Sequence, residues 1–431
     1  MVGTMRAIGV LSALALAVGS CQALAAPGDL DRSFGAGGKV RWDRSWRDKV
    51  VDVVTQADGK VLALIETGRR PGDNSGARIS AVVRFHSGGR IDRRFGLNGI
   101  APIRPRTRTS AAGLALDPRG RIVAGYTHDP LGAGNEAFAV ARFGSRGRPD
   151  ESFDNDGIQA IGFGPGLESP RAHDIAVGPN GEIVIAGRVT DYTATYVDFA
   201  VAKLTEEGEL DETFSGDGRV THGFSAEYER DEARGVTLDS QGRVVAVGFA
   251  STGVVENLAI ARYRTDGSLD DSFAGDGTLV SSFGNRGNAV LASERITVAG
   301  AGAKDFLVAR YLADGSPDPT FSQDGAVAVD FADLADKALD LSPSGGGGLV
   351  VTGTARATRT SSDFGVARLE EDGTLDRRFS DDGRRRIDFS GGRDAAAAVA
   401  VGRAGEVVVG GMTRRRGADG ALAKLRGRGG Q

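Results

Sequence analysis

Short hydrophobic runs rich in valine, alanine and isoleucine recur along the chain, separated by polar turns that contain glycine. The clearest run is FAVARF from Phe138, which returns as FAVAKL from Phe199, LAIARY from Leu258, FLVARY from Phe306 and FGVARL from Phe364. A valine-rich run precedes each of these, as in IVIAG from Ile183 and VVAVG from Val244. Runs of this length with β-branched and aromatic residues, bounded by turns such as DPRG and GPNG, predict β-strands. The chain is therefore expected to be all-β.

The runs follow one another in the same order throughout the chain. A small apolar strand is followed by the valine-rich strand, the FAVARF-type strand and, after a polar motif, a strand that often ends in Phe. Four short strands in a unit of roughly 58 residues are typical of one blade of a β-propeller. Tandem immunoglobulin-type sandwiches need about 100 residues each, and a nonapeptide β-helix has a far shorter repeat.

The polar motif G-x-x-D-x-x-F-x-x-x-G occurs seven times without a mismatch, beginning at Gly28, Gly89, Gly147, Gly208, Gly267, Gly315 and Gly373. We expect the first Gly to need positive φ in a tight turn, the Asp to accept main-chain N–H groups, and the Phe to fill the space between neighbouring sheets. The structural residues of the motif are therefore Asp31, Phe34, Asp92, Phe95, Asp150, Phe153, Asp211, Phe214, Asp270, Phe273, Asp318, Phe321, Asp376 and Phe379.

Calcium is the alternative reading of these acidic turns. Asp150 with Asp154 and Asp156, or Asp270 with Asp276, offers hard oxygen ligands. A Ca²⁺ ion needs six to eight oxygens and usually a bidentate Glu, and the later Asp is absent from the first two copies of the motif. The structural reading is favoured, and no cofactor is expected.

The two ends of the chain complement each other. The first unit begins with the motif and a strand at residues 39–43, whereas the last unit stops after its third strand, near residues 421–425. Pairing the N-terminal strand with the last unit would close a ring and protect the sheet edges. Counting the second strands, near Val61, Ile122, Ile183, Val244, Ile296, Val350 and Val407, predicts seven four-stranded blades.

The motif and the glycine-rich valine strand resemble the delta-60 repeat family of bacterial proteins over nearly all of the mature chain. This resemblance implies an exported repeat protein of the propeller kind, and it supplies no catalytic residues.

The first 26 residues have the pattern of a secretory signal, with Arg6, an apolar run and small residues before the cleavage site. We expect residues 1–26 to be removed and residues 27–431 to form one propeller domain in the periplasm or outside the cell. The alternative is a lipoprotein anchored through Cys21, because the sequence VGSC resembles a lipobox. No later segment has the roughly 20 apolar residues of a transmembrane helix.

Composition narrows the classes of partner. Cys21 is the only cysteine, so the mature chain has no disulfide or thiolate site. The 53 basic and 57 acidic residues are interspersed, which argues against nucleic acid. Glycine, 65 of 431 residues, is about twice its usual share and indicates many turns. We expect a monomer whose partner is a protein or a glycan.

Binding is expected at one end of the propeller, where the variable loops emerge between second and third strands and between fourth and first strands. We call this end the loop face. Variable loops on a rigid scaffold commonly carry binding, and aromatic residues and arginine dominate binding hot spots. The residues expected on the loop face are Trp46, Arg69, Tyr126, His128, Tyr192, Tyr196, Tyr228 and Arg356. A non-enzymatic binding scaffold is the favoured function.

An enzyme is the competing class, because exported propellers include lactonases, lyases and quinoproteins. Such a site needs convergent polar groups and a metal or cofactor in the central channel. The candidates at the channel mouth are Asp52, His173, Asp174, Arg234 and Asp336. Their spacing does not specify a reaction.

Overall fold

The structure is a computed structural model, and it describes residues 26–45, 47–68, 79–103, 108–129, 136–191, 196–224, 230–251, 254–332, 334–358, 360–389, 391–414 and 417–427. Within these ranges the regular elements are 28 β-strands. The expected all-β class is confirmed, and the strands follow the hydrophobic runs of the sequence.

The strands form antiparallel groups of four. The first three groups are β2 (Arg47–Thr55), β3 (Val61–Gly68), β4 (Ile79–Phe85) and β5 (Ile100–Pro102); β6 (Arg108–Leu116), β7 (Ile122–Asp129), β8 (Ala137–Phe143) and β9 (Ile158–Ile161); and β10 (Leu167–Val177), β11 (Ile183–Asp191), β12 (Tyr196–Leu204) and β13 (Arg219–His222). Two further groups are β14 (Glu232–Leu238), β15 (Val244–Ser251), β16 (Glu256–Tyr263) and β17 (Thr278–Ser281); and β18 (Arg286–Ala292), β19 (Ile296–Ala301), β20 (Phe306–Tyr311) and β21 (Ala326–Val329).

The last two groups bring the chain back to its beginning. They are β22 (Lys337–Pro343), β23 (Leu349–Arg356), β24 (Ser362–Leu369) and β25 (Arg384–Ile387); and β26 (Arg393–Val401), β27 (Val407–Arg414), β28 (Ala418–Leu425) and β1 (Lys39–Trp42). β1 pairs antiparallel with β28, with Lys39 opposite Ala423 and Trp42 opposite Gly420. The N-terminal strand is therefore the fourth strand of the group that the C-terminal strands begin.

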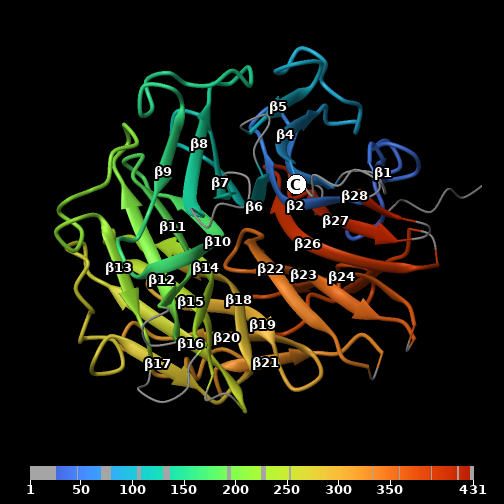
Figure 1. The fold of residues 1–431 in the computed structure, drawn as a ribbon. Helices are drawn as coiled ribbons and strands as arrows, with labels where there is room; N and C mark the ends of the chain where they lie inside the picture. The colour runs from blue at the N-terminus through green and yellow to red at the C-terminus, as the bar shows by residue number, and fades with distance from the viewer. Residues whose placement is uncertain are drawn as a thin grey trace, which may run out of the picture.

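The first strand of each group lies nearest the centre of the molecule (Figure 1). Along the chain, β2, β6, β10, β14, β18, β22 and β26 each contact the next, and β26 contacts β2. Two single parallel bridges, Ser362 to Arg393 and Arg47 to Ala418, also join neighbouring groups. The inner strands thus surround a central region to which all the groups contribute.

Apolar side chains fill the spaces between neighbouring groups. The motif phenylalanines Phe34, Phe95, Phe153, Phe214, Phe273, Phe321 and Phe379 have no exposed surface. The first Gly of the next motif packs directly on such a ring: a Cβ on Gly147 or Gly208 would lie 2.7 Å from Phe95 or Phe153, respectively. Both glycines have positive φ, so the turn conformation and the close contact each require glycine.

The residue after each motif Phe links two groups through the main chain. Ala274 has φ of 54°, and its N–H donates to the carbonyl of Asp314 in the next motif turn at 2.8 Å. The same bond runs from Ser380 to Pro27 at 2.9 Å, which joins the last motif to the N-terminal segment. Each motif is thereby held in place by the turn of its neighbour.

The basic partner of each motif Asp was not anticipated from the sequence; it lies eight positions before the Asp in the last six motifs, and for Asp31 of the first motif it is Lys424 of the last group. Arg262 donates from Nε to Asp270 at 2.8 Å and from Nη1 to the carbonyl of Ala313 at 2.6 Å, and its guanidinium lies 4.8 Å from the centroid of Phe273. The equivalent residues Arg84, Arg142, Lys203, Arg310, Arg368 and Lys424 pair with Asp92, Asp150, Asp211, Asp318, Asp376 and Asp31. The conserved spacing of Arg or Lys from the motif was the available signal.

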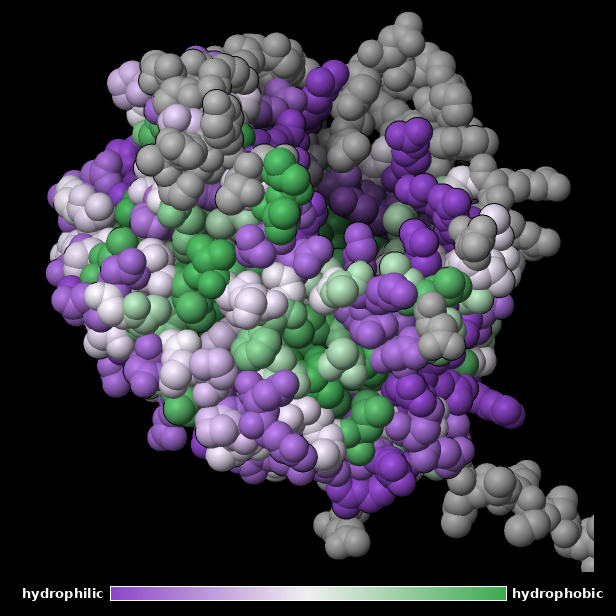
Figure 2. Space-filling view, turned by 90° about the horizontal axis from the view of Figure 1, so that it is seen from below, coloured by the Kyte–Doolittle hydropathy of each residue, from purple (hydrophilic) through white to green (hydrophobic). Residues whose placement is uncertain are grey.

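The surface of the described residues has few large exposed hydrophobic side chains, and these are Leu97, Val254, Val255 and Val280. Figure 2 shows hydrophobic and hydrophilic residues interspersed over one side of the molecule. In the described part of the chain, no helix has the length and apolar character needed to cross a bilayer.

Candidate functional site

Each inner strand has a β-bulge, and the bulged residues line one central pocket. The register shifts leave one residue unpaired between Val50 and Asp52, and likewise at the same point of the other six inner strands. A bulge turns a side chain away from its normal direction in the sheet. The unpaired residues Val51, Ala112, His173, Arg234, Asn288, Leu339 and Ala397 all line a pocket of about 220 Å³, which we call the channel pocket.

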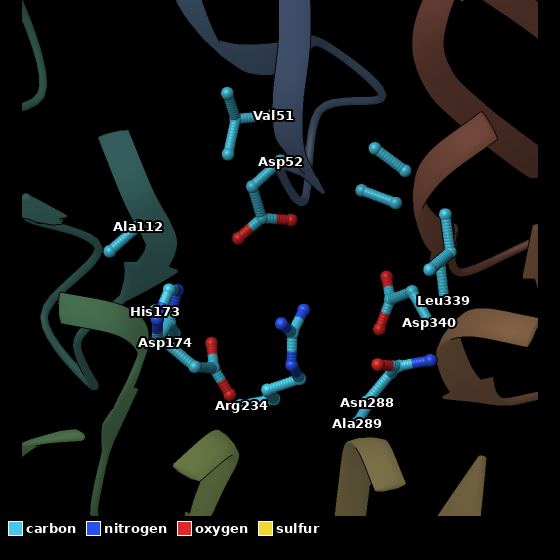
Figure 3. A pocket seen from close by; sticks show the side chains of 12 residues that line it. Val51, Asp52, Ala112, His173, Asp174, Arg234, Asn288, Ala289, Leu339 and Asp340 are labelled. Atoms are coloured by element: carbon cyan, nitrogen blue, oxygen red, sulfur yellow. The ribbon is translucent and has the colours of Figure 1, made fainter. Parts of the chain in front are cut away.

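Three aspartates that follow these bulges point toward the middle of the channel pocket (Figure 3). Each carboxyl group accepts two main-chain N–H groups, one from its own strand and one from the next group of strands. Asp174 accepts from Ile175 at 2.8 Å and from Val236 at 2.9 Å. In the same way, Asp52 accepts the N–H groups of Val53 and Leu114. Asp340 accepts those of Leu341 and Val399. These carboxyl groups therefore connect neighbouring groups of strands around the channel.

The surroundings of these carboxyl groups favour their neutral form. Burial raises the pKa of Asp52 to about 6 and, together with the charge of Asp52, the pKa of Asp174 to about 7. Burial and the charges of the other two carboxylates raise the pKa of Asp340 well above its ordinary value. Near neutral pH the pocket thus holds carboxyl groups in both protonation states, and both hydrogen-bond donors and acceptors are present.

A buried glutamate at the loop face lies beside this pocket. Glu232 begins β14 and is only 2% exposed. Its Oε1 lies 3.0 Å from His173 Nε2 and 2.8 Å from Arg234 Nη2, and its Oε2 lies 3.2 Å from Arg230 Nη2 and 3.6 Å from Arg188 Nε. Burial acts to raise the pKa of Glu232, but the bond from His173 and the neighbouring arginines lower it to about 2. Glu232 is therefore ionised at neutral pH.

The guanidinium groups around Glu232 extend into a larger cluster. Arg230, Arg234 and Arg286 all lie over the buried ring of Phe249, at 5.9, 5.5 and 4.6 Å from its centroid. Arg286 also forms a bidentate pair with Glu256. Such stacking of a guanidinium on an aromatic ring is a cation–π contact. Arg171 lies opposite Arg188 in the pairing of β10 with β11. We call Arg171, Arg188, Arg230, Arg234 and Arg286 the arginine cluster.

The structure places the sequence-predicted loop-face residues in different environments. Tyr196 begins β12 and is partly exposed, and Arg356 ends β23 and is exposed. Tyr126 has no exposed surface and His128 is 8% exposed, so the expectation that these two side chains are displayed is wrong. Both lie on β7, whose side chains pack on one face against β3 and β4 and on the other against β10 and β11. Trp46, Arg69, Tyr192 and Tyr228 lie outside the described residues.

The sequence-predicted channel-mouth residues are brought together with one exception. Asp52, His173, Asp174 and Arg234 all line the channel pocket. Asp336 does not, because it is 2% exposed and its two oxygens accept the N–H groups of Phe331 and Arg356. Asp336 instead fixes the loop that precedes its own strand.

Two acidic groupings have the spacing of possible metal ligands in the described part of the chain. They are Asp305 with Asp330 and Asp336, and Asp363 with Asp388 and Asp394. In the second grouping Asp363 is already paired with Arg386 at 2.6 Å. Neither grouping coincides with the motif residues that the calcium reading named.

Five residues of the site were not predicted from the sequence: Glu232, Arg188, Arg286, Asn288 and Asp340. Asp340 has the same place relative to its bulge as Asp52 and Asp174, so an alignment of the first strands would have identified it. Glu232 and its partners come from β10, β11 and β14, and their proximity depends on how two groups of strands pack. No short stretch of the sequence indicates how these two groups of strands pack against each other.

Comparison with known proteins agrees with this architecture. Four segments, residues 178–214, 240–273, 293–321 and 347–379, match a family model described as a domain of unknown function (DUF5122) beta-propeller. The match supports a β-propeller repeat family. No curated protein matches the chain in sequence.

Several solved structures are similar in shape at low sequence identity. A protein of unknown function from Dyadobacter fermentans is 13% identical, with a TM-score of 0.48, covering 91% of this chain and 98% of that one. The β-propeller domain of the trilobed protease from Pyrococcus furiosus is 12% identical, with a TM-score of 0.46 and coverages of 90% and 96%. An α-L-arabinofuranosidase from Fusarium graminearum is 11% identical, with a TM-score of 0.45 and coverages of 90% and 97%.

Proposed function

We propose that the chain is an exported, seven-bladed β-propeller of the delta-60 repeat kind that acts as a binding scaffold through its loop face. Seven blades are supported by the seven groups of four strands and by the seven bulged residues around the channel pocket. Closure of the ring is supported by the pairing of β1 with β28 and by the contact of β26 with β2. Export rests on the signal-like N-terminal sequence.

The observation that carries the binding function is the arrangement of charged groups around Glu232. Four basic side chains from β10, β11, β14 and the segment before it converge on one buried carboxylate. Scaffold roles are filled elsewhere, by the motif phenylalanines and by the basic partners of the motif aspartates. These contacts also join two groups of strands, but charged groups that converge at the loop end of a rigid scaffold are characteristic of a binding surface.

The alternative is a propeller enzyme of the lactonase, lyase or quinoprotein kind, and it would use the channel pocket. The raised pKa values of Asp52 and Asp174 favour it, because general acids and bases are commonly tuned toward neutral pH. However, both oxygens of each carboxyl group already accept main-chain N–H groups that connect the blades. A group held by two such bonds is restrained from moving to a substrate, so the scaffold reading is preferred.

One experiment separates the two functions. Purified protein is incubated with a panel of polysaccharides and proteins, bound material is measured by surface plasmon resonance, and the size of each polymer is measured before and after incubation. Binding without a change in polymer size supports the scaffold. Shortening of a polymer that stops in an Asp174→Asn variant would reject it in favour of the enzyme.

A further inference from the structure

We propose that the arginine cluster and the adjoining channel pocket together bind an acidic sugar unit, a uronate or a sulfated sugar, of a polysaccharide. This inference rests on the proposed binding function and names its ligand class. Two properties of the site carry it: an excess of guanidinium groups at the loop face, and a neighbouring pocket suited to hydroxyl groups.

The excess of positive charge can be counted from the contacts. Among the residues that the structure describes, the five guanidinium groups of the arginine cluster have three carboxylate partners, those of Glu136, Glu232 and Glu256. In the described part of the chain, the nearest carboxylate oxygen to Arg188 is that of Glu232 at 3.6 Å, beyond hydrogen-bond distance. Asp231 is close in sequence, but it is buried and accepts the N–H groups of Phe224 and Ser251. The cluster therefore retains donors for a further anion.

The positively charged guanidinium groups of the cluster also repel one another. Burial lowers the pKa of Arg188 and of Arg234, and like charges add to this effect, from Arg171 and Arg230 on the first and from Arg286 and Arg230 on the second. An oxyanion placed among them would relieve this repulsion. Oxyanions with two neighbouring oxygens are suited to the site because a guanidinium donates two parallel hydrogen bonds to a planar carboxylate or to two oxygens of a tetrahedral sulfate.

The channel pocket is the part of the site that is suited to hydroxyl groups. Asp52, Asp174, Asp340 and Asn288 point into it (Figure 3). An amide and a protonated carboxyl group each donate and accept hydrogen bonds, whereas an ionised carboxylate only accepts, so the lining offers both donors and acceptors to hydroxyl groups. The pocket volume of about 220 Å³ is roughly that of seven water molecules, which is comparable with one sugar ring.

Two side chains belong to both halves of the site. Arg234 and His173 line the channel pocket and also contact Glu232 beside the arginine cluster. A ligand that fills both halves must therefore carry an oxyanion and hydroxyl groups within one small unit. Uronates and sulfated sugars have this combination. An acidic peptide has the oxyanion without the neighbouring hydroxyl groups, and it serves as the competing ligand in the test.

The test is calorimetric titration of the purified protein with matched pairs of polymers. Oligogalacturonate is compared with neutral galactan, and dextran sulfate with dextran, while poly-glutamate represents an acidic peptide. We expect both acidic polysaccharides, or one of them, to bind at least about tenfold more tightly than the neutral partner, and binding to weaken between about 0.05 and 0.5 M salt. A response to only one identifies whether carboxylate or sulfate is the natural group.

Variants locate the site. An Arg188→Gln, Arg230→Gln double variant should weaken binding of the acidic polymer by about tenfold or more, and Arg188→Lys should have a smaller effect because it keeps charge without the fork of donors. Arg414→Gln, which removes an exposed arginine at the end of β27, is the matched control and should bind normally. Thermal melting verifies that each variant is folded.

Three outcomes overturn the inference. The acidic sugar is rejected as the ligand if the neutral and acidic polymers bind equally, or if the double variant binds as well as wild type. Either result leaves the proposed binding function standing. Tighter binding of poly-glutamate than of both acidic polysaccharides replaces the ligand class with an acidic protein. Failure of the earlier panel to detect any bound polymer or protein overturns the proposed function itself.

Discussion

Replacing Asp174 by Asn should change how the stability of the protein depends on pH. The pKa of Asp174 is raised from 3.8 to about 7 by burial and by the charge of Asp52. The folded protein therefore holds this proton more tightly than the unfolded chain does. Its contribution to stability is complete below pH 3.8 and is lost as the pH rises toward 7.

The size of the effect follows from the pKa shift. Linkage with these two values gives a loss of about 2.5 kcal/mol from Asp174 alone between about pH 5 and pH 8. The variant also loses one acceptor for the N–H groups of Ile175 and Val236, which costs roughly 1–3 kcal/mol at every pH.

The assay is urea unfolding at several pH values between about 5 and 8, which avoids the range where ordinary carboxylates titrate. The free energy of unfolding of wild type should fall with pH more steeply than that of Asp174→Asn. Asp52 and Asp340 contribute in the same direction in both proteins, and His222, whose pKa is lowered by burial, contributes in the opposite direction in both. Asp271→Asn, which alters a 72% exposed side chain, should parallel wild type. Parallel curves for wild type and Asp174→Asn would refute the assignment of a raised pKa.

Three other predictions concern the connections between blades. Phe273→Ala should lower the free energy of unfolding by about 3–5 kcal/mol because the ring is fully buried, whereas Leu97→Ala, at a 72% exposed position, should change it by less than about 0.5 kcal/mol; similar losses in urea unfolding would contradict the role of the motif ring. Arg262→Met should cost roughly 1–3 kcal/mol by removing one of the two close arginine partners of the buried Asp270, which keeps Arg243 at 3.1 Å, and Arg262→Lys should cost less because Lys203 occupies the same place in another repeat; equal losses for Met and Lys would argue against the ion pair. Removing residues 26–42 should expose the edge of β28, with a lower melting temperature and aggregation on size-exclusion chromatography; a monomeric truncated protein with unchanged melting would reject ring closure by β1.

Much of the fold could be predicted because the same pattern of strands and turns recurs in every repeat of the sequence. The FAVARF-type runs became β8, β12, β16, β20 and β24, and the strand expected at residues 39–43 became β1 at Lys39–Trp42. The motif Phe was identifiable because a large apolar residue among turn residues has few roles other than filling space between sheets. These features depend on neighbours close in sequence or on an equivalent neighbour in the next repeat.

The site could be predicted only in part, because it depends on side-chain direction. Tyr126 was expected at the surface, yet β7 is covered on both faces and buries seven of its eight residues. His173 and Arg234 reach the channel pocket because a bulge redirects them, and the sequence does not reveal a bulge in one repeat taken alone. The convergence on Glu232 further requires the relative placement of β11 and β14.

The bulges also have a consequence for how the protein can diversify. A bulged residue has no partner across the strand pair, so its side chain can change without altering the ladder on either side. The seven positions already range from Val51 and Ala112 to His173 and Arg234. The lining of the channel pocket can therefore change one position at a time, and a library confined to these seven residues would vary the pocket without altering the strand pairing.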